Sequence, residues 1–299
     1  MMNETQTPRP VVFGEVLFDC FPDGSVVLGG APFNVAWHLQ AFGQAPVFVS
    51  RVGDDALGHR IRDTMHAWEM DTSGLQLDSA HPTGKVEIRF VEGEPHYEII
   101  DNQAYDFIDA GAVPPLQQGA VLYHGSLALR NAVSRHALEE IRRKYQPCVL
   151  VDVNLRNPWW QREGILQLLQ GGNWVKLNEH ELALLGGDDI APADASARLL
   201  RDFGLELLIV TRGSAGAVAL TAAGEEARVA PQRVAQVTDT VGAGDAFTSV
   251  VLLGQAHHWP LPVLLERAQQ FASAIVGVRG ATVNDAGFYR PFIRDWGLS

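Results

Sequence analysis

The stretch TDTVGAGDAFTSVVLLG, residues 238–254, places two glycines and an alanine directly before Asp245 and an almost wholly apolar segment after it. Apolar residues recur at helical spacing after Asp245, which predicts a buried helix. Gly242 and Gly244 permit a tight turn whose amides point out of the electropositive end of that helix, as an anion site requires. Alternatively, Asp245 is only a first-turn carboxylate that complements the helix dipole.

A second glycine pair stands in LGGAPFN, where Gly29 and Gly30 precede a predicted helix with Asn34 near its start. In a purely structural interpretation, Asn34 is the N-cap of this helix and Gly43 ends it. In a functional interpretation, the glycines let the backbone approach a small polyol closely while Asn34 bonds one of its hydroxyls.

Two further motifs are equally ambiguous. In NEHE, Asn178 and Glu181 have the spacing of a capping box. Glu181 could instead lie near a phosphate-bound Mg²⁺, through water, because Mg²⁺ keeps much of its hydration shell. In TRGSAG, Thr211, Gly213 and Gly216 could form a plain turn between strands or line the phosphates or ribose of a nucleotide.

The rest of the chain alternates short apolar runs with helical patterns, which predicts an α/β fold with a mostly parallel sheet and helices on both faces. Ligands bind beyond the carboxyl ends of strands in such sheets, and several predicted strands end in polar residues, among them Asp19, Asp152 and Arg156. The predicted strands are 11–18, 45–53, 120–125, 148–154, 174–178 and 207–211, and the predicted helices are 33–42, 56–68, 134–145, 179–185 and 193–203.

Two segments, 24–30 and 83–101, have no helix between their strand-like runs, and EGEP supplies a hairpin turn within the second. We expect them to form a small accessory sheet on a single domain spanning 1–299. Such a sheet could act as a lid that excludes water from a site. It could also pair through its edges with a second subunit in a homodimer.

Composition narrows the class of protein. The 299 residues carry a formal net charge of −12, which argues against nucleic acid or an anionic membrane as the main partner. Cys20 and Cys148 are far apart and fit a reducing compartment, although one disulfide between them stays open. The N-terminus does not resemble a signal peptide and no run of about 18 apolar residues occurs, so we expect a cytoplasmic protein.

Missing motifs exclude several enzyme classes. The sequence has no GxxxxGK[ST], which disfavours a P-loop kinase. GAGDAF lacks the third glycine of a dinucleotide fingerprint, which disfavours a Rossmann dehydrogenase. Neither GxSxG nor HExxH is present.

Taken in order along the chain, GGAPFN, GDDALG, DVNLR, NEHE, TRGSAG and DTVGAGDAF resemble the motifs of the ribokinase-like (pfkB) carbohydrate kinases. Among the subfamilies, GGAPFN and DVNLR are most similar to fructokinases. The 2-keto-3-deoxygluconate kinases more often have an acidic residue at the position of Pro32. The resemblance implies a ribokinase-like three-layer fold and ATP-dependent phosphorylation of a sugar hydroxyl.

The same resemblance assigns expected roles to individual residues. On the phosphate side it implies Asp245 as catalytic base, the amides of Gly242, Ala243 and Gly244 as the anion hole, and Arg156 beside the transferring phosphate. It also implies sugar contacts from Asp19, Gly29, Gly30 and Asn34, and nucleotide contacts from Asn178, Thr211, Gly213 and Gly216. Glu181 would organise Mg²⁺, and Asp239 would help to hold a monovalent cation such as K⁺.

Two features depart from the family pattern: Val250 stands where a small residue is usual, and Arg212 stands where many members have an apolar residue. Asp245, as a carboxylate at a helix N-terminus, should also be a weak base, because the dipole favours its charged form.

Fructose is the favoured substrate. The alternatives are 2-keto-3-deoxygluconate, another ketose or a nucleoside, and a non-catalytic sugar or nucleotide sensor on the same fold. Arg89 or Arg130 could meet the carboxylate of an acidic sugar, or be ordinary ion-pair partners.

Overall fold

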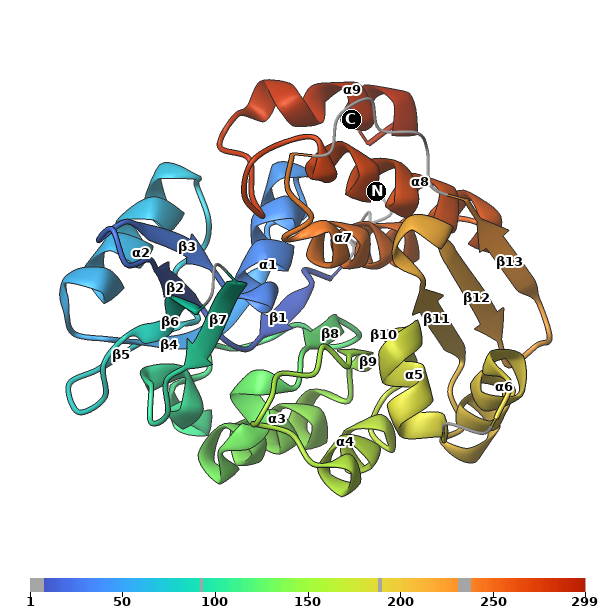
Figure 1. Cartoon of the computed structure of the whole chain (residues 1–299), viewed down its shortest axis with the longest axis horizontal. Coiled ribbons are helices and arrows are strands. Elements are labelled where there is room, and N and C mark those ends of the chain that lie inside the picture. Colours follow the sequence, from blue (N-terminus) through green and yellow to red (C-terminus); the bar gives the residue numbers. More distant parts are fainter. Residues whose placement is uncertain (1–7, 92–93, 188–189, 231–237, 299) are drawn as a thin grey trace, which may run out of the picture.

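The computed structural model describes residues 8–91, 94–187, 190–230 and 238–298. Its large sheet contains β1 (Val11–Phe13), β4 (Val47–Gly53), β5 (Leu75–Asp78), β8 (Val121–His124), β9 (Cys148–Asp152), β10 (Trp174–Asn178), β11 (Leu207–Thr211), β12 (Ala217–Thr221) and β13 (Glu226–Val229). The strand order is β13-β12-β11-β10-β9-β8-β1-β4-β5 (Figure 1). All pairs from β5 to β11 are parallel, and β12 and β13 extend one edge as antiparallel strands.

Helices cover both faces of this sheet and bury two separate apolar clusters against it. One face carries α1 (Ala31–Ala41), α2 (Ala56–Ala67), α7 (Ala243–Ala256), α8 (Leu261–Val276) and α9 (Ala286–Trp296). The other carries α3 (Ala132–Tyr145), α4 (Arg162–Leu169), α5 (Glu179–Gly186) and α6 (Pro192–Asp202). The predicted three-layer α/β fold is confirmed.

The central strands are apolar throughout because both of their faces are covered. In β9, Val149 and Val151 belong to the cluster under α3–α6, whereas Leu150 belongs to the cluster under α1 and α7. Helix boundaries follow local capping: α3 begins after Asn131, whose side chain accepts a hydrogen bond from the Val133 amide at 2.9 Å. It ends before Gln146, which takes a left-handed conformation.

A second, smaller sheet is formed by β2 (Leu17–Cys20), β3 (Val26–Gly29), β6 (Gly84–Val91) and β7 (Glu94–Ile99), in the order β3-β2-β6-β7. In Figure 1 it lies at the left of the molecule, on the opposite side from β11–β13. The expected accessory strands are therefore present, but β2 also joins them. Residues 92–93 of the EGEP turn lie outside the described residues.

The prediction of one strand over 11–18 is wrong. The chain leaves the large sheet after β1 and enters the small sheet at β2, with residues 14–16 between them. The apolar pattern could not locate this break, because the residues on both sides of it are buried. The connection carries Glu15, which is only 3% exposed.

Two short 3₁₀ helices, η1 (Ala104–Phe107) and η3 (Leu127–Arg130), pack against the small sheet. Cys20 and Cys148 are both free thiols. None of the described helices combines the length and the apolar character that crossing a membrane requires.

Candidate active site

Asp245 and Asn34 meet where α7 and α1 pack together. The Asn34 side-chain amide donates a hydrogen bond to Asp245 Oδ2 at 2.7 Å. Asn34 is buried inside α1, whose N-cap is Gly30, so the interpretation of Asn34 as the N-cap is wrong. The helix begins earlier than predicted because Pro32 is suited to its first turn.

The other expected sugar contacts surround the start of α1. A Cβ on Gly29 would lie 3.9 Å from Asp19 Oδ2, so the end of β3 approaches the Asp19 side chain. A Cβ on Gly30 would lie only 2.8 Å from the Glu15 carbonyl oxygen. The β3–α1 turn therefore packs directly on the β1–β2 connection, and Asp19, Gly29 and Gly30 gather at the N-terminal end of the helix that carries Asn34.

The glycine turn before Asp245 forms the N-terminus of α7. Gly242 is the N-cap in a left-handed conformation, with φ at 79°, and Ala243 is the first helical residue. The Ala243 amide makes one long hydrogen bond, at 3.4 Å, to the Thr240 carbonyl. The first amides of a helix have no partner within it and lie at its positive end, so this turn can bind an anion.

A buried ion pair lies beside this turn. Lys176 Nζ is 2.9 Å and 3.1 Å from the two carboxylate oxygens of Asp152, and Thr248 Oγ1 donates to the same carboxylate at 3.1 Å. A Cβ on Gly244 would lie 3.3 Å from Lys176 Nζ, which places the ammonium group against the start of α7. Sequence reasoning missed Lys176; a lysine in the middle of the apolar strand WVKLN was the available signal.

Protonation equilibria in the site are strongly perturbed. Burial raises the pKa of Asp245 to about 6, although the Asn34 hydrogen bond and the Lys176 charge oppose the rise. Asp245 is therefore a stronger base than expected, because desolvation outweighs the helix dipole. Burial would lower the pKa of Lys176, but the Asp152 charge and hydrogen bonds raise it overall.

Two more carboxyl groups share this environment. Burial raises the pKa of Glu15 to about 7 and also raises the pKa of Asp19. The Arg156 charge opposes all three rises, at Glu15, Asp19 and Asp245, which places this exposed guanidinium within electrostatic reach of each carboxyl group. Glu15 was also missed; its signal was a charged residue inside the apolar run VVFGEVLF.

Asn178 and Glu181 form the capping box of α5 in full. The Asn178 side chain accepts from the Glu181 amide at 2.9 Å, and Glu181 Oε2 accepts from the Asn178 amide at 2.8 Å. Glu181 Oε1 also accepts from the Leu155 amide at 2.8 Å, which ties α5 to the DVNLR segment. With a backbone donor on each oxygen, the carboxylate fits a water-mediated contact to Mg²⁺ better than direct coordination.

Thr211 is paired in register with Asn178 at the ends of β11 and β10. Gly213 opens a short 3₁₀ turn, and a Cβ on Gly216 would lie 1.9 Å from the Val229 carbonyl, so close backbone packing alone accounts for that glycine. Asp239 accepts hydrogen bonds from the amides of Val241 (3.0 Å) and Gly280 (3.1 Å), and thereby joins the glycine turn to the segment after α8.

The sequence pattern of the pfkB family carbohydrate kinases matches residues 20–286. The chain belongs to this family. This carbohydrate kinase is 35% identical to a fructokinase of Klebsiella pneumoniae over 83% of the chain and 84% of that protein. It is 32% identical to a fructokinase of Escherichia coli over 81% of the chain and 83% of that protein.

Solved structures resemble the kinase over nearly its whole length. A fructokinase of Vibrio cholerae, bound to fructose, ADP and calcium, superposes with a TM-score of 0.80 at 26% identity, covering 95% of this chain and 98% of the other. The aminoimidazole riboside kinase of Salmonella enterica, complexed with aminoimidazole riboside and an ATP analogue, has a TM-score of 0.82 at 28% identity, covering 97% and 99%. Both enzymes share the present fold.

Proposed function

We propose that this kinase transfers the γ-phosphate of ATP to a hydroxyl group of fructose, and that Asp245 is the base. The hydrogen bond between Asn34 and Asp245 carries the proposal, because it brings a predicted sugar contact and a predicted base together beside an anion-binding helix terminus. The fructokinases of Klebsiella pneumoniae and Escherichia coli support fructose as the acceptor.

In the proposed reaction, Asn34 and Asp19 hold the sugar so that one hydroxyl faces Asp245. The hydroxyl oxygen attacks the γ-phosphorus, the bond to the bridging oxygen of ADP breaks, and the hydroxyl proton passes to Asp245. A pKa of about 6 leaves most of the Asp245 carboxyl ionised at pH 7, so it can accept that proton.

Fixed hydrogen-bond donors stabilise the negative charge on the phosphoryl group in the proposed reaction. We assign this role to the amides of Gly242, Ala243 and Gly244 and to Arg156, because phosphoryl transfer depends mainly on positioning and electrostatic stabilisation. Bound Mg²⁺ would neutralise charge on the ATP phosphates, with Glu181 contacting it through water. The proposal also includes K⁺ bound near Asp239 and nucleotide contacts from Asn178, Thr211, Gly213 and Gly216.

The burial of the carboxyl groups in the site favours a neutral sugar over 2-keto-3-deoxygluconate. The raised pKa values of Glu15, Asp19 and Asp245 indicate surroundings in which negative charge is already unfavourable. Arg130 is committed to an ion pair with Asp106 at 2.7 Å, and exposed Arg89 pairs with Glu87 at 2.9 Å. Because both guanidinium groups are already paired, we expect neither to bind a substrate carboxylate.

A riboside is the second candidate acceptor, because the Salmonella enterica riboside kinase has the same fold over almost the full chain. A sensor without catalysis is disfavoured, since a sensor needs no desolvated base beside an anion site. We would measure ADP release with fructose, other ketoses, aldoses, 2-keto-3-deoxygluconate and aminoimidazole riboside. The highest kcat/KM should belong to fructose; a higher value for any other acceptor would refute the fructokinase assignment.

We further propose that the small sheet is a lid and that two lids pair in a homodimer. Strand register places Asp19, Val27 and Val86 on one face of the sheet, together with Phe90 and Tyr97. Val27, Phe90 and Tyr97 are 44%, 57% and 61% exposed. A face that carries Asp19 and Val27 at one end and exposed Phe90 and Tyr97 at the other fits a lid whose tip is covered by a partner subunit.

A further inference from the structure

Arg130, the last residue of η3, has a guanidinium buried between three segments of the chain. Its Nε and Nη2 donate to the two carboxylate oxygens of Asp106 at 2.7 Å each. Nη2 also donates to the Ile100 carbonyl at 2.6 Å. The side chains of Arg130 and Asp106 are only 5% and 1% exposed, and the bidentate pair fixes the plane of the guanidinium.

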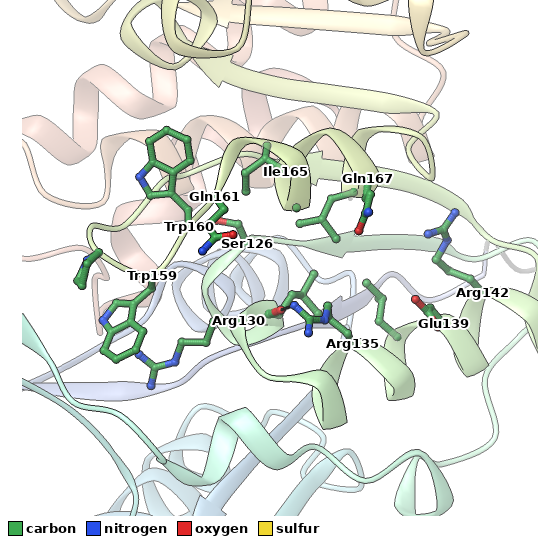
Figure 2. A pocket seen from close by; sticks show the side chains of 15 residues that line it. Ser126, Arg130, Arg135, Glu139, Arg142, Trp159, Trp160, Gln161, Ile165 and Gln167 are labelled. Carbon is green, nitrogen blue, oxygen red and sulfur yellow. Dashed lines mark hydrogen bonds between the residues drawn. The ribbon is translucent and has the colours of Figure 1, made fainter.

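The same guanidinium stacks on Trp159, as Figure 2 shows at one end of the groove between α3 and α4. Arg130 Cζ lies 4.2 Å from the centroid of a Trp159 ring and 5.3 Å from that of Tyr105. The attraction of a cation to an aromatic face strengthens when both are desolvated. The Trp159 amide in turn donates to the Arg156 carbonyl at 2.8 Å, so Trp159 and Arg156 belong to one turn.

Ile100 gives Arg130 its third connection, to the lid. Ile100 follows β7 directly, and its amide donates to the Lys85 carbonyl of β6 at 3.2 Å. The Arg130 guanidinium thus contacts both the end of β7 in the lid and the turn that contains Arg156. Apolar side chains can often replace a buried ion pair without loss of stability. The fixed geometry of the Arg130–Asp106 pair therefore explains an arginine at this position better than a contribution to stability does.

We propose that Arg130 is a positioning residue, which acts through Trp159 to hold Arg156 in place for phosphoryl transfer and anchors the lid at the same point. This inference rests on the proposed roles of Arg156 and of the lid. Arg130 Nε and Nη2 donate to Asp106 and Ile100, and Nη1 is buried away from solvent without a partner among the described residues, so we expect Arg130 to influence turnover only through its neighbours.

A double-mutant cycle tests the proposal with Arg130→Lys, Arg156→Met and the double variant. Arg130→Lys keeps a positive charge beside Asp106 but loses the planar fork, so thermal unfolding must first show that the variant is folded at the assay temperature. Its kcat should fall about 10- to 100-fold, the size of effect that small misplacements produce. In the Arg156→Met background the same substitution should cause no further fall, because nothing remains to be positioned.

Arg9→Met is the control, because it breaks an ion pair with Asp71 (2.6 Å) at the amino ends of β1 and β4, whereas the candidate site lies beyond carboxyl ends of strands, and it should leave kcat unchanged. Should Arg130→Lys fail to fold, Trp159→Leu enters the same cycle and removes only the stack. An unchanged kcat in Arg130→Lys, or an equal fall in both backgrounds, would overturn the inference. An Arg156→Met variant with full kcat would instead refute the proposed role of Arg156 itself.

Discussion

The Asn34 side chain donates a hydrogen bond to Asp245 at 2.7 Å, although the two residues are 211 positions apart in the chain. Asn34 belongs to the helix that follows the β3 turn, and Asp245 belongs to the helix that follows the glycine turn. This bond therefore joins the segment proposed to bind the sugar to the segment proposed to bind the phosphate. It also explains why α1 and α7 must pack together before either half of the site is complete.

Replacing Asp245 by asparagine should nearly abolish turnover and leave binding of sugar and ATP within a small factor. Asparagine cannot accept the sugar proton, and general-base contributions are typically ~10²–10⁴-fold. The loss should appear in kcat, as it does for an interaction made mainly in the transition state. Steady-state kinetics of Asp245→Asn, with Glu163→Gln in the first turn of α4 as a control, provides the measurement. A variant that keeps more than about a tenth of wild-type kcat contradicts the assignment.

The same substitution should stabilise the fold at neutral pH. The pKa of Asp245 rises from 3.8 to about 6 on folding, so the folded protein binds more protons than the unfolded chain between these values. Stability from this group is complete below pH 3.8 and is lost as pH rises through 6. Asp245→Asn should therefore melt at a higher temperature than wild type at pH 7.5, and the difference should vanish toward pH 4. A lower melting temperature at pH 7.5 would show that the charge is stabilising.

Activity should rise with pH as Asp245 ionises. We expect kcat/KM to follow an apparent pKa of about 6 and to fall roughly tenfold per pH unit below it. The Asn34 hydrogen bond lowers the pKa of Asp245, so Asn34→Ala should move this acid limb to higher pH, in addition to raising KM for the sugar. A pH profile of wild type and Asn34→Ala tests the direction; a limb that moves to lower pH would contradict the proposed coupling.

Two glycines of the turn should respond differently to alanine. Gly242 has a left-handed φ, and a Cβ there would lie 2.4 Å from Ala281, so Gly242→Ala should lower both the melting temperature and kcat. Gly244 is helical, and a Cβ there would lie 3.3 Å from Lys176 Nζ, which would have to move by only a few tenths of an ångström. Gly244→Ala should therefore fold normally. Thermal unfolding of both variants is the measurement, and equal destabilisation would contradict the geometry.

Disrupting the exposed apolar face of the lid should dissociate the proposed homodimer. Phe90→Glu places a charge near exposed Tyr97 on this face, whereas Arg89→Gln changes the neighbouring residue on the opposite face. Light scattering should show a dimer for wild type and Arg89→Gln and a monomer for Phe90→Glu. A monomeric wild type at micromolar concentration would refute the dimer, and a dimeric Phe90→Glu would place its interface elsewhere.

The apolar runs of the sequence predict most of the large sheet, because parallel strands buried on both faces leave a strong pattern. Strands β4, β8, β9, β10 and β11 agree with the predicted segments to within a few residues. The break between β1 and β2 could not be predicted, since both strands are buried and only tertiary pairing separates them. Helices α4, α8 and α9 were not among the predicted segments, although their apolar residues pack on the same clusters.

Part of the candidate site could be predicted from the sequence. The glycine turn, Asn34 and the capping box of Asn178 lie at strand or helix ends, where local patterns are informative. Lys176 and Glu15 lie within apolar strands or their connections, and their partners come from distant segments. The pKa of Asp245 depends on burial by several elements at once, so the helix dipole alone gave the wrong direction.

The order of strands in the large sheet has a consequence for synthesis on the ribosome. From β8 onward, each new strand is added beside the one made just before it, until β13 completes the edge. The strands of the lid and the helix bearing Asn34 emerge earlier, whereas α7 follows only after β13. Because α1 packs on α7, a nascent chain cannot complete the proposed sugar-binding half until α7 has left the ribosome. Truncated translation products that end before α7 should accordingly neither bind the sugar nor consume ATP.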